Sequence, residues 1–587
     1  MSKKLTHADL LTLGQALGYK LEIYGLCRGF AGMLNQAVLA EDQNTFFNRL
    51  QFIESYNKDF KKLNNDIEEA RHYAKGKIFA TLDDETKTLL EIPAFYEGIE
   101  LYLAPGFHVD LFATNAILQG NIQEIYFFVR SQKLEQENKE ISIALNKSYA
   151  FDKQSLIAYI KDLEQVLDGQ GVAAPIMLSN SNHTVNLRYD TKNKKWQYTD
   201  TNDFACHPKN TSYSRELDSE LLTESIFYSF CCKQHAYTVF NTQILIEKKQ
   251  QKSLQNALDK FNEKYPIKPE LVTMYDDYKT SLLYIACQNG QLEMVRELLK
   301  QQDININHAN NNRLTPLYIA CQNRYVEVVH ELLKQQGINV NQANNNDVTP
   351  LYTSCRNGHV EMVRELLKHG NIHINQADNK GITPLYAACH NGHYEVVLEL
   401  LKQEGIDINQ ADNEGITPLY AACRNGHYEV VRELLKHEGI GINQANSKGA
   451  TPLHIACRKG HTRIAAILMD SKHIDSINSL DSKKNTPLHI ACRSNHTYGK
   501  KELFEALLNK GASLSLKNKF GKSASDCAIK KKNTSAIEVI NSFQSNFDEE
   551  NVLESTKNFP LEDARFFNKK HPIAQQNNHE MIVINQA

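Results

Sequence analysis

A period of 34 residues runs through the second half of the chain. Seven of the twelve cysteines keep this register, with a last gap of 35 residues: Cys287, Cys321, Cys355, Cys389, Cys423, Cys457 and Cys492. A fixed period of this size is typical of a solenoid, in which each unit buries its apolar face against its neighbours. Because 587 residues are too many for one compact core, we expect a repeat array joined to at least one other domain.

The sequence around each cysteine predicts the secondary structure of one repeat unit. Thr383-Pro384 opens a short helix, since Thr accepts hydrogen bonds from first-turn amides and Pro loses no needed donor at the first helical position. Asn391-Gly392-His393 closes it, because Gly allows a left-handed exit. A second, amphipathic helix follows, as over 428–435, and then a polar hairpin, as over 409–415.

Helix, turn, helix and polar hairpin, with the text Thr-Pro-Leu-Tyr/His-x-Ala, resemble the ankyrin repeat, whereas the period alone would equally fit tetratricopeptide units. Eight units open at Ser281, Thr315, Thr349, Thr383, Thr417, Thr451, Thr486 and Ser523. The first and last units are irregular, as capping units are. The resemblance implies an all-α solenoid over residues 266–543 that binds a protein partner.

The in-register cysteines stand beside Ala on the first helix of each unit, so we expect small buried apolar side chains there. Equivalent residues of neighbouring units lie ~10 Å apart, too far to share a metal ion. A zinc site at Cys231, Cys232 and His235 is disfavoured because adjacent cysteines chelate one ion poorly. We expect no metal and no cofactor.

The hairpin tips vary while the framework recurs: Asn312, Asn346, Lys380, Glu414, Lys448 and Lys484. Variation at positions to which the fold is indifferent predicts a partner-binding surface. The alternative for any single tip is a solvated polar residue that contacts nothing.

Charge and hydropathy limit the classes of partner that this chain can bind. There are 66 Lys and Arg against 69 Asp and Glu, a net charge of −3, and no segment is basic enough to indicate nucleic-acid binding. The apolar runs are far shorter than the ~20 residues that span a bilayer. Asp9 interrupts the first apolar stretch, which argues against a Sec-type signal. We expect a monomer without stable membrane insertion, in a reducing compartment.

Residues 1–265 show no repeat and are long enough for a core of their own. A glycine turn at Gly25 precedes a stretch of helical periodicity that contains Cys27, so the Cys27 thiol belongs in a first helical turn, where the helix dipole favours a thiolate. The alternative is a core cysteine, since Cys27, Phe30 and Leu34 share one apolar stripe.

Two alternating runs after His183 predict a β-hairpin. With a loop over residues 190–193, His183 stands opposite Asp200, and the carboxylate would orient the imidazole. A shift of two residues would place Asn202 opposite His183 instead.

Cys27 at a helix start, then His183 and Asp200 on successive strands, resembles the papain-like cysteine proteases and is similar to the YopT-like bacterial effectors. The resemblance implies an α+β papain-like fold in which Cys27 attacks an acyl carbon, His183 transfers the proton and Asp200 orients His183. Leu21 stands where papain has its oxyanion Gln, so Gln15 is the substitute candidate. Acyltransferases, transglutaminases and deamidases use the same order of residues, and an inactive domain is the other alternative.

Residues 544–587 read as a polar, flexible tail that resembles type IV translocation signals. The whole arrangement resembles effectors that intracellular bacteria such as Legionella inject into host cells. This resemblance implies a hydrolase, protease or isopeptidase, delivered to the host cytoplasm and directed to a host protein by its repeats. The alternative is a non-catalytic adaptor that only binds host proteins.

Overall fold

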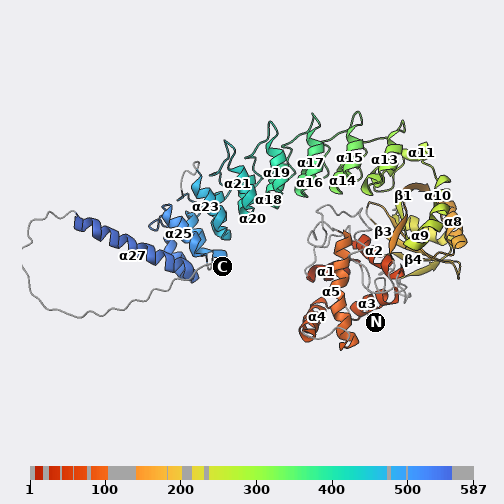
Figure 1. Cartoon of the computed structure of the whole chain (residues 1–587), viewed down its shortest axis with the longest axis horizontal. Helices are drawn as coiled ribbons and strands as arrows, with labels where there is room; N and C mark the ends of the chain where they lie inside the picture. Colours follow the sequence, from red (N-terminus) through yellow and green to blue (C-terminus); the bar gives the residue numbers. More distant parts are fainter. Residues whose placement is uncertain are drawn as a thin grey trace, which may run out of the picture. The chain divides into compact units, whose positions relative to one another are not determined.

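The computed structural model (Figure 1) describes residues 7–17, 26–39, 43–56, 58–75, 81–103, 140–181, 183–200, 214–230, 237–471, 477–497 and 500–557. The chain divides into two compact units, residues 1–448 and 449–587.

Among the described residues before the first strand, the first unit has the helices α1 (His7–Ala16), α2 (Leu26–Leu39), α3 (Gln43–Ser55), α4 (Phe60–Ala74) and α5 (Asp84–Leu103). They share one buried apolar cluster that includes Leu10, Leu50, Ile67 and Tyr96. Asp59 caps α4 by accepting a hydrogen bond from the backbone N–H of Lys62. The cluster gives these helices a core that is separate from the core of the sheet described next.

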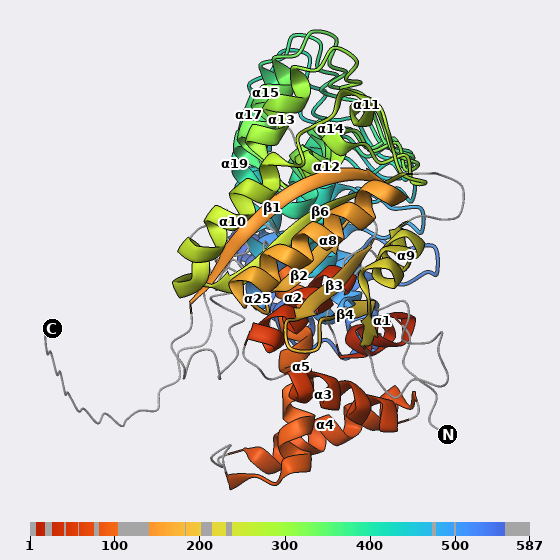
Figure 2. The ribbon, with the colours of Figure 1, turned by 90° about the vertical axis from the view of Figure 1, so that its right-hand side faces the viewer.

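An antiparallel six-stranded sheet follows, with strand order β1-β6-β2-β3-β4-β5. Its strands are β1 (Ile141–Asp152), β2 (Pro175–Ser179), β3 (Thr184–Asp190), β4 (Lys195–Asp200), β5 (Arg215–Leu217) and β6 (Tyr237–Glu247). The helices α8 (Lys153–Gln170), α9 (Ser219–Phe230) and α10 (Gln251–Glu263) pack with it, and a short 3-10 turn, η5 (Lys248–Gln250), precedes α10. Figure 2 shows α8 lying across the strands.

The core of the sheet combines Leu, Ile and Val side chains with several aromatic rings. Trp196 and Tyr189 are buried with their ring centroids 5.0 Å apart, and both contact Glu164 of α8 through hydrogen bonds. Asp152 caps the start of α8, and Gly171 ends it in the left-handed conformation. The N-terminal region therefore contains both strands and helices, as expected for an α+β domain.

Repeats of two helices and a hairpin occupy the rest of the first unit, after the single turn α11 (Pro269–Val272). Their helices are α12 (Leu282–Gln288), α13 (Leu292–Leu299), α14 (Pro316–Gln322), α15 (Val326–Leu333), α16 (Pro350–Arg356), α17 (Val360–Leu367), α18 (Pro384–Asn391), α19 (Tyr394–Leu401), α20 (Pro418–Asn425) and α21 (Tyr428–Leu434). Figure 1 shows α13, α15, α17 and α19 side by side in chain order.

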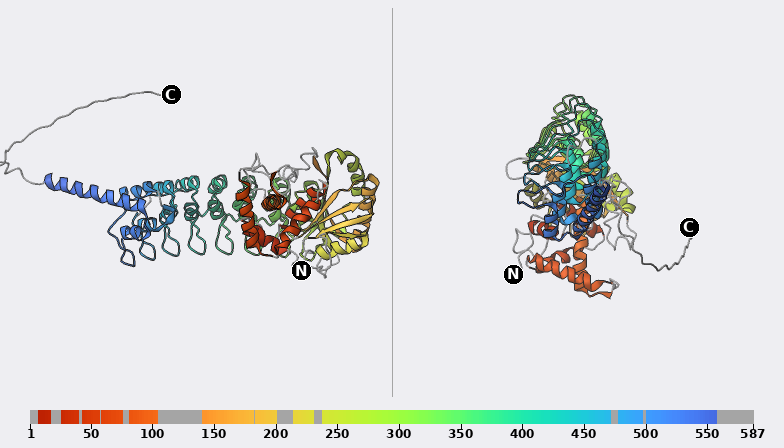
Figure 3. Two further views of the ribbon diagram at one scale, coloured as in Figure 1. Left: turned by 90° about the horizontal axis from the view of Figure 1, so that it is seen from below. Right: turned by 90° about the vertical axis from the view of Figure 1, so that its left-hand side faces the viewer.

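The second unit contains α22 (Pro452–Lys459), α23 (Thr462–Asp470), α24 (Pro487–Arg493), the 3-10 turn η6 (Asn495–Thr497), α25 (Lys501–Asn509), α26 (Ala524–Lys531) and α27 (Thr534–Lys557). Hairpins project from one side of the helices in successive repeats (Figure 3). The all-helical repeat array is confirmed.

All eight predicted repeat openings are helix caps. The side chain of each opening Ser or Thr accepts a hydrogen bond from a backbone N–H three residues on, as Thr383 does from Tyr386 at 3.1 Å. Gly392 ends α18 with φ 76°, and a Cβ there would lie 2.4 Å from the ring of His427. Glycine is therefore required at this turn for both conformation and space.

A ladder of asparagines joins neighbouring repeats. Asn307, Asn341, Asn375 and Asn409 each donate from Nδ2 to a carbonyl oxygen thirty residues on, at 2.6–2.8 Å. Each also accepts a backbone N–H of the next repeat through Oδ1. Both ends of each amide are thus used, and these polar contacts complete the register set by the apolar helices.

The helix α27 departs from the sequence-based expectation. A flexible chain is predicted from residue 544, yet α27 continues to Lys557. No Gly or Pro occurs between Thr534 and Lys557, so nothing in the backbone chemistry ends the helix at 543. The predicted tail over residues 558–587 lies outside the described residues.

Candidate functional site

His183 and Asp200 meet at the end of the sheet. Nε2 of His183 lies 2.8 Å from Oδ1 of Asp200, within hydrogen-bond distance. Both side chains are buried, with exposed fractions of 7% and 3% for the residues. A buried carboxylate in this position holds the imidazole in one orientation, and it leaves base chemistry to the other ring nitrogen, Nδ1.

The other oxygen of Asp200 is held by two hydroxyl groups. Tyr198 donates to Oδ2 at 3.1 Å, and Ser229 of α9 donates to the same atom at 2.5 Å. Phe230 covers the imidazole, with ring centroids 5.9 Å apart. A buried carboxylate is costly unless its lone pairs are satisfied, and this network satisfies both oxygens. Tyr198, Ser229 and Phe230 were not predicted as site residues, although Tyr198 alternates with Asp200 along one strand.

The hairpin register differs from the predicted one by two residues. Asp190 pairs with Lys195, and Val185, not His183, stands opposite Asp200. The turn begins one residue later than predicted because the Asp190 carboxylate accepts the N–H groups of Lys192 and Asn193 while its backbone remains in the ladder. His183 reaches Asp200 diagonally across the strands, as side chains of this size can.

Cys27 is the second residue of α2, so the predicted helix start is present. The side chain of Cys27 lies outside the described residues. The side chain of Asn186 in β3 donates to the carbonyl oxygen of Ala31 at 3.2 Å, and farther along the helix Asn35 borders a cavity with Arg188 of the same strand. Since α2 and β3 advance in the same direction, α2 begins at the end of β3 that follows His183.

Contacts from both sides fix the loop that carries His183. Asn180 accepts the backbone N–H of His183 through Oδ1 at 2.8 Å. The hydroxyl of Ser181 lies 2.9 Å from that of Thr280, which is fully buried and directly precedes the first repeat. The hairpin of the first repeat therefore touches the loop of the candidate base.

The first repeat also contacts the opposite edge of the sheet. Gln291, at the turn between α12 and α13, donates to Asn241 of β6 at 2.7 Å. It also forms a hydrogen bond with Ser148 of β1 at 2.8 Å. These contacts cross the predicted domain boundary at residue 265.

Other predicted site residues fall elsewhere. Gln15 is exposed near the end of α1. Leu21, Asn202 and the cluster Cys231, Cys232 and His235 lie outside the described residues. Within the described ranges, no three His, Cys, Asp or Glu side chains are grouped to hold a metal ion.

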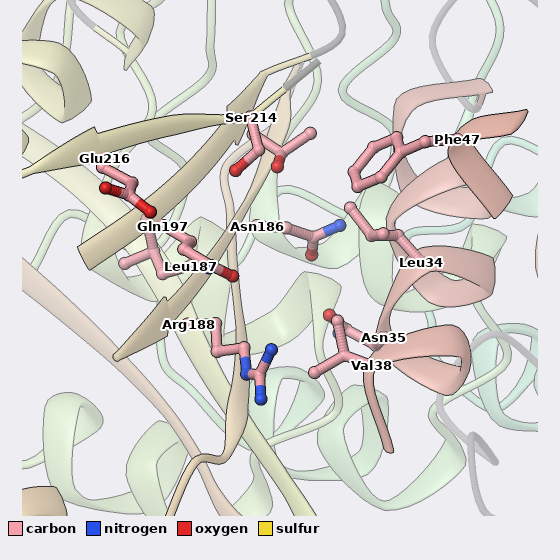
Figure 4. A pocket seen from close by; sticks show the side chains of 11 residues that line it. Leu34, Asn35, Val38, Phe47, Asn186, Leu187, Arg188, Gln197, Ser214 and Glu216 are labelled. Carbon is pink, nitrogen blue, oxygen red and sulfur yellow. The ribbon is translucent and has the colours of Figure 1, made fainter. Parts of the chain in front are cut away.

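A polar cavity of about 210 Å³ lies between α2 and the sheet (Figure 4). Asn35 and Leu34 face Asn186 and Arg188 across it. Asn35 is buried, and its amide has no hydrogen-bond partner among the described residues. The cavity does not include His183 or Asp200, so it is distinct from the candidate catalytic pair.

The hairpin tips are exposed, as expected for a binding surface. The fold uses the backbone of the tips. The carbonyl oxygens of five positions accept an N–H from the next hairpin: Asn312, Asn346, Lys380, Glu414 and Lys483. The backbone N–H of a tip donates to the Asn or Asp two residues earlier, as Lys380 does to Asp378. Lys484 was predicted as the sixth tip, but it occupies the following position, with φ 54°. The equivalent tip is Lys483, and Phe520 occupies the same position in the eighth repeat.

The in-register cysteines are buried and form no disulfide, and Cys527 is buried as well. Burial raises the pKa of each in-register thiol, for example Cys389, well above its ordinary range. A thiol that remains protonated and shielded from solvent is a poor nucleophile.

The paired helices and projecting hairpins show that the second half of the chain is a solenoid of repeats. The family model described as ankyrin repeats in three copies matches residues 243–344, 336–412 and 404–481, and the single ankyrin repeat matches 483–519. The chain therefore contains ankyrin repeats. The crystal structure of the human ASB11 ankyrin repeat domain is similar at 29% identity, covering 39% of this chain and 97% of that one, with a TM-score of 0.34. No curated protein matches.

Proposed function

We propose that this protein is an adaptor whose ankyrin repeats bind a partner protein. The observation that carries the proposal is that the backbone and the side chain of each hairpin tip have different roles. The tip backbone is used by the fold, while the tip side chain is exposed and changes from Asn to Lys to Glu along the array. Ankyrin repeats and other solenoids present extended surfaces of this kind to proteins.

A charge exchange at the tips tests this function. Glu414→Lys with Lys448→Glu leaves the net charge and the backbone contacts unchanged, so partners selected by the tips should be lost. The matched control exchanges an exposed pair on the second helix, Glu429→Lys with Arg432→Glu. Cross-linking in a host-cell lysate measures the captured proteins. An identical set of captured proteins for all three chains would refute partner selection by the tips.

A second function is favoured by the hydrogen bond between His183 and Asp200. We propose that the N-terminal domain is a papain-like cysteine hydrolase, a protease or isopeptidase. Support comes from the buried pair, from the start of α2 at Leu26, and from the parallel course of α2 and β3. Acyl transfer and deamidation on the same residues are the alternatives within this function.

In the proposed reaction, the Cys27 thiolate attacks the acyl carbon, and an imidazolium on His183 gives its proton to the leaving amine. Water then attacks the thioester while His183 takes the proton from it, which releases the acid and restores the thiol. Asp200 stabilises the imidazolium. The backbone N–H of Cys27 supplies one oxyanion donor, and Gln15 is the candidate for the second.

Labelling with an electrophilic acyl probe tests the hydrolase. Cys27 should be the labelled residue, and His183→Ala should abolish the labelling while the thermal unfolding transition remains in place. Labelling that survives in Cys27→Ala would contradict the assignment. Proximity labelling with a Cys27→Ala chain, which holds a substrate without turning it over, would then identify the substrate.

We further propose delivery to the host cytoplasm by a type IV-like system, on the resemblance of residues 544–587 to translocation signals. A reporter enzyme fused to the chain should appear in the host cell only when these residues are present. Among the described residues, no helix is long and apolar enough to cross a bilayer.

A further inference from the structure

One position of the repeat carries cations that the fold does not use. Seven residues after each helix cap, at the end of the first helix, the chain has Gln288 and Gln322 in the first two repeats. The next three repeats have Arg356, His390 and Arg424. These three side chains, called the cationic row below, lie on α16, α18 and α20, which pack side by side.

The arginines of the row differ from those on the second helices of the same repeats. Arg364 of repeat three is paired with Glu399 at 2.8 Å, and Arg432 of repeat five is paired with Glu429 at 2.6 Å. Arg356 and Arg424 are exposed, and neither forms an ion pair within the part of the chain that the structure describes. The second helices thus neutralise their charge internally, and the first helices do not.

The row also repels itself. Burial lowers the pKa of His390, and the neighbouring Arg424, His427 and Arg356 lower it further. The nearby hairpin carboxylate of Asp378 is already engaged, since it accepts two backbone N–H groups and the hydroxyl of Tyr352. Asp412 of the next hairpin is engaged in the same way by two backbone N–H groups. His390, with its lowered pKa, is neutral near pH 7, and a carboxylate bound beside it would favour its charged form. The exposed charges of Arg356 and Arg424, which form no ion pair among the described residues, favour a ligand that brings negative charge.

We propose that the cationic row binds an extended, acidic segment of a partner protein, which deepens the adaptor function proposed above. Neighbouring first helices lie ~10 Å apart, and an extended segment in the polyproline II conformation advances about 3.1 Å per residue with three residues per turn, so that every third side chain points to the same side. Carboxylates at every third residue of the segment therefore meet successive members of the row. The occupant is a polypeptide with Asp or Glu in that spacing.

The second unit continues the same chemistry. Its equivalent positions carry Arg458, Arg493 and Lys530, all exposed and without an ion pair among the described residues. Residues 449–543 contain 16 Lys and Arg against seven Asp and Glu, a net of +9 that the net charge of the whole chain, −3, conceals. This corrects the expectation that no segment is markedly basic. Of the exposed large apolar side chains described in this unit, Leu480, Leu516 and Ile529 are aliphatic and suit a protein partner, whereas Phe520 is aromatic.

Fluorescence anisotropy of the full chain with a labelled peptide tests the row. The probe has Glu at every third position with uncharged residues between, and its controls carry Gln in place of Glu or the same number of Glu at one end. We expect Arg356→Gln with Arg424→Gln to weaken binding about tenfold, since two exposed charge pairs are lost. Gln is the residue of the first two repeats at this position, so the change suits the fold.

The matched control is Arg364→Gln with Arg432→Gln in the same two repeats, which should change the affinity less than twofold. Equal effects of the two double variants, or equal binding of the Gln peptide, would overturn the proposal. So would tighter binding of a single-stranded oligonucleotide or of anionic phosphatidylserine vesicles that is lost with Arg356 and Arg424. If the peptide fails while the tip exchange still alters partner capture, the inference fails and the adaptor function stands.

Discussion

The two regions of this protein use buried polar groups for different purposes. In the sheet domain, Asp200 and His183 are buried together, and the carboxylate is satisfied by Tyr198 of β4 and Ser229 of α9. In the array, buried polar groups are caps and ladders that recur every repeat, as with Thr383 and Asn375. The array repeats one local solution, whereas the candidate site is assembled once from distant parts of the chain. A substitution in one region should therefore have a different effect on stability and on the candidate site from a substitution in the other region.

Leu385→Ala is expected to produce the largest loss of stability. Leu385 is fully buried on α18, and removal of such a side chain leaves a cavity that costs about 3 kcal/mol. Urea unfolding followed by circular dichroism measures the change. The effect should remain in the array, so the acyl-probe labelling of Cys27 in native buffer should not change. If Leu385→Ala reduced the labelling of Cys27 as strongly as it reduced the stability of the array, the two regions would not be independent.

Acid should weaken the array through His359. Burial lowers its pKa from 6.5 to about 4, while its Nδ1 lies 3.1 Å from the carbonyl oxygen of Cys321. A depressed native pKa means that the unfolded chain binds the proton more readily, so stability is present above pH 6.5 and is lost as the pH falls toward 4. This residue accounts for about 2 kcal/mol between pH 7 and pH 4.5.

Urea midpoints at the two pH values measure this loss. In His359→Gln the difference in the free energy of unfolding between the two pH values, obtained from the midpoints and the slope of the urea transition, should be smaller by about 2 kcal/mol. An unchanged difference would show that His359 is not depressed in the native state. His393 and His454 also have pKa values lowered by burial, so part of the acid sensitivity should persist.

His183→Ala should lower the rate at which iodoacetamide alkylates Cys27 at pH 7 by roughly 30-fold. An isolated thiol with a pKa near 8.5 is only about 3% thiolate at this pH, whereas a thiolate–imidazolium pair is almost fully ionised. Mass spectrometry of the modified residue gives the rate, and the buried array cysteines serve as internal controls. A rate that is the same in both chains would favour the binding-only alternative for the domain.

Thr383→Ala should cost about 1 kcal/mol, the usual value of a lost helix cap, and Thr383→Ser should recover most of it. Lys380→Ala, three residues earlier, should change stability by less than about 0.5 kcal/mol because only its backbone oxygen is used by the next hairpin. Urea unfolding compares the three variants. A larger effect at Lys380 than at Thr383 would reverse the assignment of cap and tip.

Sequence predicts the array well because its determinants are local. A cap at Thr383, a left-handed turn at Gly392 and an apolar face all lie within one period, and eight copies average out any irregularity. The hairpin after His183 was found for the same reason. Its register was wrong by two residues because the carboxylate of Asp190 is used by the turn while its backbone stays in the ladder, and alternation alone does not distinguish these cases.

The surroundings of Asp200 were harder to predict. Ser229 and Phe230 come from a helix about thirty residues away in sequence, and only packing brings them to the carboxylate. The charge row was missed because its members are ordinary surface residues one repeat apart. Arg356 and Arg424 are distinguished by the absence of an ion pair among the described residues, because the nearby carboxylate of Asp378 is used by its own hairpin, and coordinates are needed to recognise this.

The hydroxyl contact between Ser181 and Thr280 has a consequence for how the chain tolerates cleavage. Thr280 belongs to the hairpin of the first repeat, and its partner lies two residues before His183. Cleavage of the chain between the sheet domain and the first repeat would remove the covalent link that keeps Thr280 close to Ser181, one anchor of the histidine loop. Any catalytic role of His183 would then depend on an intact chain between the two regions.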